Sequence, residues 1–420
     1  MSQLLPTPKK SKKPLIPNGN SLTLASSRQL IKSNSFPPDD LIHEKWLPGV
    51  FGVLDIGSTK ITCLIGQGKS NGKLQVLGYG WRRSHGVRQG GIVSLKAAER
   101  AIRSAVGQAE EAAERRLNKI YVNLSGGKPS SQIFHVDYPI GGREINTQDI
   151  YRIVNEGVLR AQINGREIIH ALPLSFEVDE TAGIEDPRGY QCNRLSTQVH
   201  VIDTSSTSLR NLATVLTKAE LEIEAIVSTP LAAGLAVMTA DERDLGATII
   251  DLGGGTTSIG IYSENQLIHT SQIPIGGTHI TRDIASILST SIDTAEWLKT
   301  TRGSVEYLYG DSQQIPIQIM GDNDYDSVIN ISLSKVISII RPRIEETLEL
   351  IRDRLDNVNV GYNTKNRVIL TGGGSLLDGI GPLAAKILNR QIRLGKPNNI
   401  IGLPDDNTTA ATFSTAAGLL

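Results

Sequence analysis

The sequence predicts an α/β fold of two similar lobes, with a small α+β subdomain inserted into the first lobe. An apolar strand that ends in an aspartate and runs into a turn of glycine and hydroxyl residues occurs twice, at Asp55 and at Asp251. In both copies a second β-rich segment follows the turn directly. Residues 125–203, between the copies, have strand and helix patterns of their own and are enough for a small subdomain. A repeated unit of this kind indicates two related lobes.

The composition is typical of a soluble chain with several domains. The 420 residues correspond to about two to four domains. Because 43 basic residues balance 43 acidic ones, the chain has no overall field that would attract nucleic acid. Two cysteines, Cys63 and Cys192, are too few for a disulfide scaffold and are expected to be reduced thiols in the cytosol. The uncharged run Ala225–Ala240 is shorter than the roughly 20 residues that span a membrane.

Residues 1–45 are expected to form a disordered tail. They are rich in proline and serine and contain a basic cluster, Lys9, Lys10, Lys12 and Lys13, without an apolar segment that would indicate a secretion signal. The alternative is that the four lysines make a weak electrostatic contact with anionic lipid or nucleic acid.

Residues 46–124 are assigned to the first lobe. A turn at residues 55–59 separates two strands, a third strand follows, and apolar residues at spacings of three to five then predict a long helix before the chain returns as a strand. The predicted elements are strands Gly49–Leu54, Ile61–Ile65 and Leu74–Gly80, helix Leu95–Leu117 and strand Lys119–Leu124.

The inserted subdomain is assigned to residues 125–203, and residues 204–228 return to the first lobe. The insertion contains a predicted helix, Gln148–Ala161, and two β-rich segments, Ile168–Leu172 and Gln198–Ile202. A further helix, Ser208–Leu221, follows with its apolar residues on one face.

Residues 229–404 are assigned to the second lobe, with an insertion at about 275–345. A C-terminal helix at about 405–420 is expected to return to the first lobe. The predicted elements are strands Ala247–Ile250, Ser258–Tyr262 and Gln266–Gln272, helix Ser334–Asn357, strand Arg367–Leu370 and helix Thr409–Leu420.

The paired turns indicate a site for a nucleotide. A turn rich in glycine directs backbone N–H groups at one point, which suits phosphate oxygens. Asp55 and Asp251 are expected to hold Mg²⁺, through water, because this ion keeps several waters and takes few carboxylates. One such turn alone is explained as well by a tight hairpin, but two turns favour the nucleotide. The assigned residues are Asp55, Gly57, Ser58, Thr59, Lys60, Asp251, Gly253, Gly254, Gly255, Thr256 and Thr257.

A third glycine turn follows the strand Arg367–Leu370. Gly372, Gly373, Gly374 and Ser375 are expected to open a helix whose first N–H groups face a phosphate or a ribose. A plain strand-to-helix turn would not require three glycines. The sequence has no Walker-type motif, which disfavours the P-loop class.

Together these motifs resemble the actin/Hsp70/sugar-kinase superfamily and, within it, the FtsA family of bacterial cell-division proteins. The phosphate-1, phosphate-2 and adenosine turns of the superfamily match Leu54–Ile61, Ile250–Thr257 and Leu370–Ser375. The segment Ala295–Gly303 resembles the part of the nucleotide lobe that places Glu296 and Lys299 near the base and ribose. The resemblance covers about Val50–Leu420.

The resemblance implies an actin-like two-lobed ATPase fold, with duplicated ribonuclease-H-like lobes and an inserted 1C-type α+β subdomain. Actin, Hsp70 and MreB have their first-lobe insertion before the first long helix, where this chain has only Trp81–Ser94. Here the insertion begins at Ser125, after the following strand, as the 1C subdomain of FtsA does. The insertion about 275–345 corresponds to subdomain 2B.

The resemblance implies ATP and Mg²⁺ as ligands and at most a weak ATPase activity. Relatives of the Hsp70 type begin the connecting helix with a glutamate near metal and water, where this chain has Thr229. Whether the chain is an enzyme stays open at this point. No residue is assigned as catalytic, because no carboxylate or glutamine is evident that would orient a water.

The function that the resemblance implies is assembly rather than metabolism. A protein of this family polymerises head-to-tail, binds the C-terminal tail of FtsZ, links the FtsZ ring to the membrane and recruits later division proteins through the 1C subdomain. Arg343 and Glu346 match the family's partner site, although a solvated helix face explains them equally well. We expect a cytoplasmic location at the division site, on the inner face of the cell membrane. The family's membrane tether lies beyond the point where this chain ends.

Two alternatives share the fold. A PilM-like pilus-assembly platform would bind a short peptide of an inner-membrane pilus protein. A small-molecule kinase would transfer phosphate to a metabolite, with Asp203 or Asp241 as the base, although aspartates at the ends of elements are usually surface residues.

Overall fold

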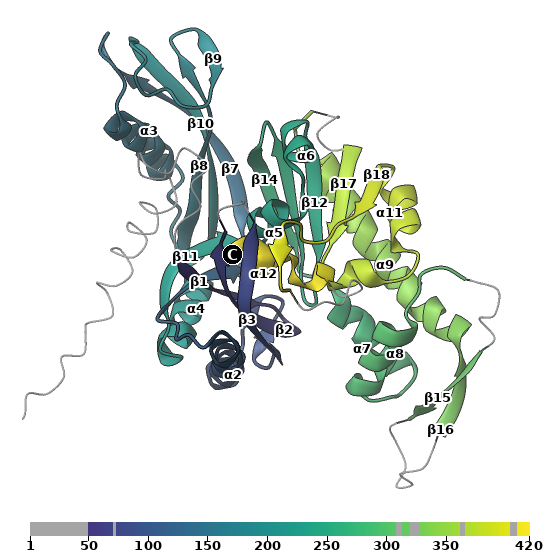
Figure 1. The fold of residues 1–420 in the computed structure, drawn as a ribbon. Helices are drawn as coiled ribbons and strands as arrows, with labels where there is room; N and C mark the ends of the chain where they lie inside the picture. Colours follow the sequence, from purple (N-terminus) through teal and green to yellow (C-terminus); the bar gives the residue numbers. More distant parts are fainter. Residues whose placement is uncertain (1–48, 70–72, 308–312, 320–327, 362–365, 404–409) are drawn as a thin grey trace, which may run out of the picture.

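The computed structural model describes residues 49–69, 73–307, 313–319, 328–361, 366–403 and 410–420. The tail at residues 1–45 therefore lies outside the described residues. In the described part, two large sheets stand side by side and a third sheet projects from the first (Figure 1).

The first sheet belongs to the N-terminal part of the chain. Its strands are β1 (Val50–Ile56), β2 (Lys60–Gly68), β3 (Leu74–Arg83), β6 (Lys119–Leu124), β11 (Glu222–Ser228) and β19 (Ile400–Ile401). Their order in the sheet is β11-β6-β1-β2-β3-β19. β1, β2 and β3 pair antiparallel, whereas β6 is parallel to β1 and β11 is parallel to β6.

The second sheet repeats this arrangement. Its strands are β12 (Ala247–Leu252), β13 (Thr257–Ser263), β14 (Gln266–Ile273), β17 (Arg367–Thr371) and β18 (Gln391–Leu394). Their order is β14-β13-β12-β17-β18, with an antiparallel meander β12-β13-β14 and two parallel neighbours, β17 and β18. The order and directions equal those of β3-β2-β1-β6-β11. The predicted duplication of an α/β lobe is confirmed.

The inserted sheet lies between β6 and β11 in the chain. Its strands are β7 (Ser130–Pro139), β8 (Arg166–Val178), β9 (Thr181–Ile184) and β10 (Arg194–Ser205). All pair antiparallel in the order β7-β10-β8-β9, and helix α3 (Thr147–Arg160) packs on them (Figure 1). A capping box at Asn146 and Asp149 starts this helix. The predicted α+β insertion is therefore confirmed.

A buried hydrogen-bond chain joins the inserted sheet to the second lobe. His200 of β10 donates from Nδ1 to the backbone oxygen of Leu267, at 2.6 Å. Its Nε2 lies 2.6 Å from the Ser131 hydroxyl of β7, which accepts the Thr270 N–H of β14 at 3.1 Å. Because Nδ1 donates to a carbonyl, Nε2 is the acceptor of the Ser131 O–H when the ring is neutral. The foot of the insertion is thus fixed to β14.

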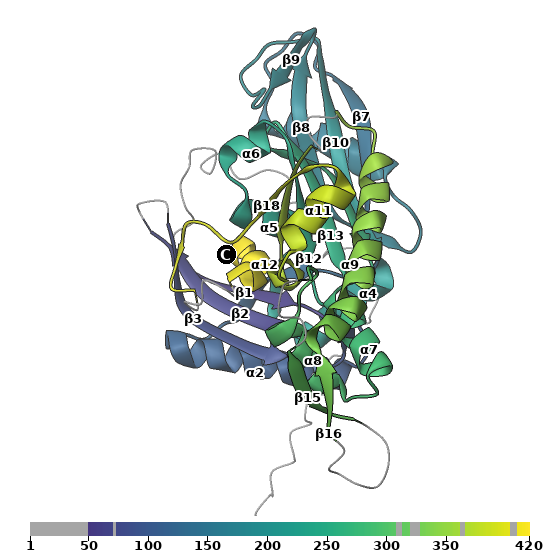
Figure 2. The same cartoon turned by 90° about the vertical axis from the view of Figure 1, so that its right-hand side faces the viewer.

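Helices cover the outer faces of the two large sheets, and two lie between the sheets. α2 (Leu95–Ala113) and α4 (Ser206–Lys218) flank the first sheet, while α9 and α11 pack on the second and α7 and α8 lie beside α9, below the end of that sheet (Figures 1 and 2). The remaining elements are α5 (Thr229–Val237), α6 (Ala240–Asp244), α7 (Gly277–Ile287), α8 (Ile292–Arg302), α9 (Leu333–Asp356), α11 (Ile380–Leu388), α12 (Ser414–Leu419), the 3-10 turns η2 (Gly373–Leu376) and η3 (Ala410–Phe413), and the hairpins β4–β5 (Val87–Arg88, Gly91–Ile92) and β15–β16 (Gln314–Gln318, Val328–Ser332).

α5 and α12 form the connection between the lobes. They pack so closely that a methyl group on Gly418 would lie 1.7 Å from the backbone oxygen of Ala232. α12 also contacts β1, β2 and β6 of the first sheet. None of the helices in the described residues is long and apolar enough to cross a bilayer.

The predicted helices differ from the observed ones at their ends; for example, the predicted helix Ser208–Leu221 is observed as Ser206–Lys218. Helix 95–117 ends at Ala113, because Glu114 adopts the left-handed conformation, at φ 52°, and caps it. The C-terminal helix begins at Ser414 after a 3-10 turn. After the third glycine turn, the chain forms η2, and the α-helix starts only at Ile380. Apolar spacing predicts a helix but not the residue at which it ends.

We predict that replacing Thr248 by valine stabilises the protein. Thr248 is fully buried in β12, and within the described residues its hydroxyl has no hydrogen-bond partner. Because an unpaired buried hydroxyl costs about 1–3 kcal/mol, Thr248→Val should raise the free energy of unfolding by about 1 kcal/mol in urea titrations. Thr257→Val is the matched control. Thr257 is also fully buried, but its hydroxyl donates to the oxygen of Ile275 at 2.9 Å, so this change should destabilise. Equal losses in both variants would contradict the prediction.

Candidate functional site

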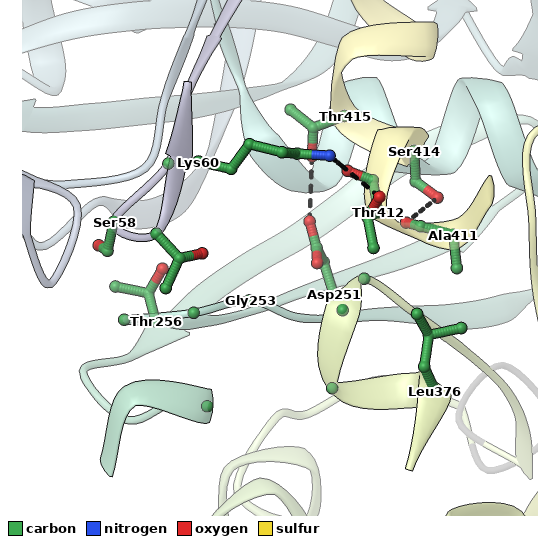
Figure 3. Close-up of a pocket in the computed structure, with 18 of the residues that line it drawn as sticks. Ser58, Lys60, Asp251, Gly253, Thr256, Leu376, Ala411, Thr412, Ser414 and Thr415 are labelled. Carbon is green, nitrogen blue, oxygen red and sulfur yellow. Dashed lines mark hydrogen bonds between the residues drawn. The ribbon is translucent and has the colours of Figure 1, made fainter. Parts of the chain in front are cut away.

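A cavity of about 540 Å³ is lined by residues of both lobes. Figure 3 shows residues of the two predicted glycine turns, of the third glycine turn and of the C-terminal segment that contains η3 and the start of α12. α8 forms a further wall of the cavity. The sequence-predicted residues that line it are Asp55, Gly57, Ser58, Thr59, Lys60, Asp251, Gly253, Gly254, Gly255, Thr256, Glu296, Lys299, Gly372, Gly373 and Gly374.

The first two turns have the same backbone geometry. The N–H of Gly57 donates to the oxygen of Lys60, and the N–H of Gly253 donates to the oxygen of Thr256, both at 3.0 Å. In each case the bond closes the turn between the two strands of a hairpin. The duplication therefore extends from the strand order down to single hydrogen bonds.

The two turns also touch each other. A methyl group on Gly254 would lie 2.4 Å from Cγ2 of Thr59, and one on Gly255 would lie 2.3 Å from Oγ of Ser58. Side chains at these positions would separate the turns, so glycine is required there for close approach. The Ser58 hydroxyl in turn accepts the N–H of Gly90 at 2.9 Å.

Each turn contributes one half-buried carboxylate. Asp55 accepts a hydrogen bond from Nδ2 of Asn123, at 2.6 Å, and Oδ1 of Asn123 accepts the N–H of Ile56 at 2.7 Å. Burial, and then the negative charge of Asp251, raise the pKa of Asp55 to about 7, against the opposite effect of Lys60. Burial likewise raises the pKa of Asp251, while a hydrogen bond from Thr415 lowers it.

These two carboxylates suit a hydrated Mg²⁺ ion. Both are disfavoured as anions by burial, and a divalent cation between them would relieve that penalty. Within the described residues no cluster of three or more metal-ligating side chains occurs. The donor set therefore fits an ion that keeps most of its waters, as Mg²⁺ does, and not one enclosed by protein ligands.

Lys60 is the cation of the first turn. Its Nζ donates to the backbone oxygen of Thr412 at 3.1 Å and contacts the Thr412 hydroxyl at 3.0 Å. The same ammonium lies 3.7 Å from the centre of the Phe413 ring. Burial lowers the pKa of Lys60 to about 8, against the opposite effect of Asp55.

Glu296 and Lys299 form the wall on α8. Their side chains pair at 2.7 Å, and the Thr281 hydroxyl donates to Glu296 at 2.5 Å. Lys299 also donates to the oxygen of Gly277 at 3.2 Å, and the Gly277 N–H donates to the oxygen of Gly253 at 3.0 Å. This chain of contacts ties α8 to the second turn.

The third turn lies directly against the second carboxylate. Gly372 has a φ of +83°, and a methyl group on it would lie 2.1 Å from Oδ1 of Asp251. A side chain at this position would displace the carboxylate as well as strain the backbone. The positive φ and the close approach of Asp251 therefore explain why the residue after this strand is a glycine.

Two of the predicted residues do not line the cavity. Thr257 and Ser375 are buried, and their hydroxyls donate to the oxygens of Ile275 and Gly372 at 2.9 and 2.7 Å. Their hydroxyls are thus used in hydrogen bonds to the backbone, Ser375 within its own turn and Thr257 to the segment that follows β14. Sequence reasoning also missed Asn123, Thr412 and Thr415, which reach the site from segments without a glycine motif.

The connecting helix α5 supplies a threonine to the wall. The Thr229 hydroxyl is buried and donates to the oxygen of Leu124 at 3.3 Å. Among the described residues that line the cavity, the carboxylates are those of Asp55, Asp251, Glu296 and Asp378.

Arg343 and Glu346 lie outside the cavity, on α9. Arg343 pairs with Asp283 of α7 at 2.6 Å and with Glu346. Hydrogen bonding to Asp283 raises the pKa of the Arg343 guanidinium. The Arg343 side chain is 28% exposed, so part of this guanidinium is accessible although both neighbours are acidic.

Comparisons with known proteins agree with this architecture. Residues 248–418 match the family described as "Cell division protein FtsA", and residues 126–203 match "SHS2 domain inserted in FTSA". The chain is 39% identical over 383 residues to "Cell division protein FtsA" of Agrobacterium fabrum, covering 88% of this chain and 86% of that protein.

Solved structures show the same fold at low sequence identity. The "PilM-PilN type IV pilus biogenesis complex" is similar at a TM-score of 0.62 and 17% identity, over 88% of this chain and 97% of that chain. MreB5 of Spiroplasma citri bound to ADP is similar at a TM-score of 0.55 and 14% identity, over 88% and 94%. The predicted actin-like fold is thereby confirmed. At these identities the likeness to PilM is one of fold alone.

Proposed function

Because the chain belongs to the FtsA family of cell-division proteins, we propose that it binds ATP with Mg²⁺, polymerises and links the FtsZ ring to the membrane. The observation that supports nucleotide binding best is the pair of touching glycine turns, each with a half-buried aspartate, at one cavity. The domain boundaries given above, with lobe 1, the 1C insertion, lobe 2 and its 2B part, remain part of this proposal.

In the proposed complex, the backbone N–H groups of the three turns and the Lys60 ammonium bind the phosphates. Asp55 and Asp251 hold Mg²⁺ through water, and the bound ion neutralises phosphate charge. Glu296 and Lys299 lie near the base and the ribose of the proposed nucleotide. These assignments rest on the lining of the cavity and on the family motifs.

We propose at most slow hydrolysis. Hydrolysis of ATP requires a group that orients the attacking water. Thr229 stands at the start of α5 with its hydroxyl bonded to a backbone oxygen, so this side chain does not offer a base. The nucleotide would then act mainly as a ligand that controls assembly.

The division role follows from the family. We propose head-to-tail self-association, recruitment of later division proteins through the 1C subdomain, and a location at the division site on the inner face of the membrane. The confirmed 1C-type insertion supports the recruitment step, because in this chain it is a separately folded sheet with its own core.

We further propose that the FtsZ tail binds on α9 beside Arg343. An acidic tail would replace part of the interaction that Arg343 now makes with Asp283 and Glu346. The two native acids therefore compete with the partner for one guanidinium. This competition makes the site testable by two changes, of which only the one at Arg343 should weaken binding.

The test is a titration of the chain, saturated with ATP and Mg²⁺, with a peptide of the FtsZ C-terminal tail. Arg343→Gln should weaken binding by about tenfold, since one charge-assisted hydrogen bond is lost. Asp283→Asn should strengthen binding or leave it unchanged, because it removes the competing carboxylate. Arg341→Gln, which alters the neighbouring pair with Glu345, is the matched control. Weaker binding in Asp283→Asn than in Arg343→Gln would contradict this site.

A further inference from the structure

The C-terminal segment, here Ala410–Leu419, contacts all three glycine turns. Lys60 of the first turn bonds to Thr412, and Asp251 of the second turn accepts the Thr415 hydroxyl at 3.0 Å (Figure 3). Thr371, which precedes the third turn, lies 2.6 Å from the Ser414 hydroxyl. The segment is therefore attached to one residue of each of the first two turns and to the residue that precedes the third.

We propose that this segment is a wall of the nucleotide site, and that Thr415, Thr412 and Phe413 are positioning residues for Asp251 and Lys60. The inference rests on the proposed nucleotide binding and deepens it. It assigns roles to residues that carry no glycine motif and that lie far from the turns in the sequence.

The Asp251 carboxylate is held from two sides. Oδ2 accepts the Thr415 hydroxyl, while Oδ1 faces Gly372 so closely that only a glycine fits there. A helical threonine commonly bonds to the carbonyl four residues earlier, which here is that of Ala411. That oxygen accepts the Ser414 hydroxyl at 2.9 Å instead, and Thr415 reaches across to the other lobe's turn. One orientation of the carboxylate is thereby selected.

The Lys60 ammonium is held in a similar way. Two of its three N–H directions are used by the carbonyl and hydroxyl of Thr412. The Phe413 ring, which is buried, stands 3.7 Å from Nζ and stabilises the cation through its π face. A lysine side chain has high rotamer entropy when free. Fixing it before the ligand arrives removes that penalty from binding.

The segment itself is anchored independently of any ligand. The side chains of Ala416 and Ala417 are buried, and Gly418 packs on the backbone of Ala232 in α5. The positions of Thr412 and Thr415 are thus set by the fold. The segment can orient the two charged groups rather than follow them.

The experiment measures binding of MgATP and of adenosine to the purified full chain and its variants. Thr415→Val should weaken MgATP binding by about tenfold, as expected for loss of one hydrogen bond to a charged group. Thr415→Ser should restore it, because the hydroxyl is kept. Adenosine, which lacks phosphates and does not need the ion, should bind equally well to all three. Thr248→Val, which removes a buried hydroxyl without a partner in the described residues, is the control and should bind MgATP as the unaltered chain does.

A second variant tests the contacts of Lys60 and leaves the residues of α12 unchanged. Thr412→Val combined with Phe413→Leu should weaken MgATP binding by about tenfold or more and leave adenosine binding unchanged. If either variant binds MgATP as tightly as the unaltered chain, or loses adenosine binding in proportion, the positioning role is wrong and the segment only packs. If the unaltered chain does not bind MgATP, the proposed nucleotide site fails together with this inference.

Discussion

Replacing Asp251 by asparagine is expected to abolish MgATP binding and yet leave the folded chain at least as stable as before. Asp251 is one of the two half-buried aspartates of the paired turns, and its removal from solvent raises its pKa. Asparagine keeps an oxygen for the Thr415 hydroxyl but carries no charge. The ion loses one of its two carboxylates, so affinity should fall by at least about a hundredfold.

The stability part of this prediction has a definite dependence on pH. A carboxyl with a raised pKa in the folded state destabilises the fold once it is ionised, at neutral pH and above. The gain from asparagine should therefore be present at pH 7 and disappear in acid, where the aspartate is protonated in both states. Urea unfolding at both pH values measures this difference.

The matched control is Asp378→Asn. Asp378 also lines the cavity, but it is exposed and is not part of the two turns. This variant should keep MgATP binding and show no gain in stability. A strong loss of stability in Asp251→Asn at pH 7, or unchanged binding, would contradict the interpretation of the aspartate pair.

Acid is expected to destabilise the protein through two buried histidines. Burial lowers the pKa of both His170 and His200 to about 4. His170 Nε2 accepts the N–H of Ser228 at 2.9 Å, and His200 Nε2 faces the Ser131 hydroxyl. Protonation would turn each acceptor into a donor and bury a charge. Both rings are therefore neutral in the folded protein.

The sign follows from linkage. An unfolded histidine binds its proton near pH 6.5, whereas the folded one does so only near pH 4. Between these values the unfolded chain holds more protons, so stability falls as the pH falls. At pH 5 each histidine should cost about 2 kcal/mol relative to pH 7.5. The free energy of unfolding, measured in urea at the two pH values, should differ by the sum of the two histidine contributions.

His170→Gln separates this effect from general acid denaturation. A glutamine oxygen can still accept the Ser228 N–H but does not titrate. The variant should lose about half of the pH-dependent difference. An identical pH dependence in His170→Gln and the unaltered chain would show that the prediction is wrong.

The sequence was sufficient for the fold and for the residues with a local signature. The glycine turns that follow Asp55 and Asp251 and the glycines at 372–374 can be predicted from the sequence, because a close backbone approach restricts the residue type to glycine. Asn123, Thr412 and Thr415 have no such signature, since their roles depend on which distant segment the fold places against them. Arg343 was recognisable as a cation, but its acidic neighbour Asp283 comes from another helix. Contacts between elements far apart in the chain were thus the part that sequence patterns did not predict.

The two turns that share one hydrogen-bond pattern differ in the charge of the residue that closes them, and that difference gives the cavity a direction. Lys60 closes the first turn where Thr256 closes the second. Two copies of the same turn would by themselves form a nearly symmetric clamp, equally suited to an anionic chain in either orientation. A single ammonium breaks that symmetry, because it gives one end of the clamp a full positive charge. A ligand whose two ends differ in charge should therefore bind in one orientation, although the two lobes have the same fold.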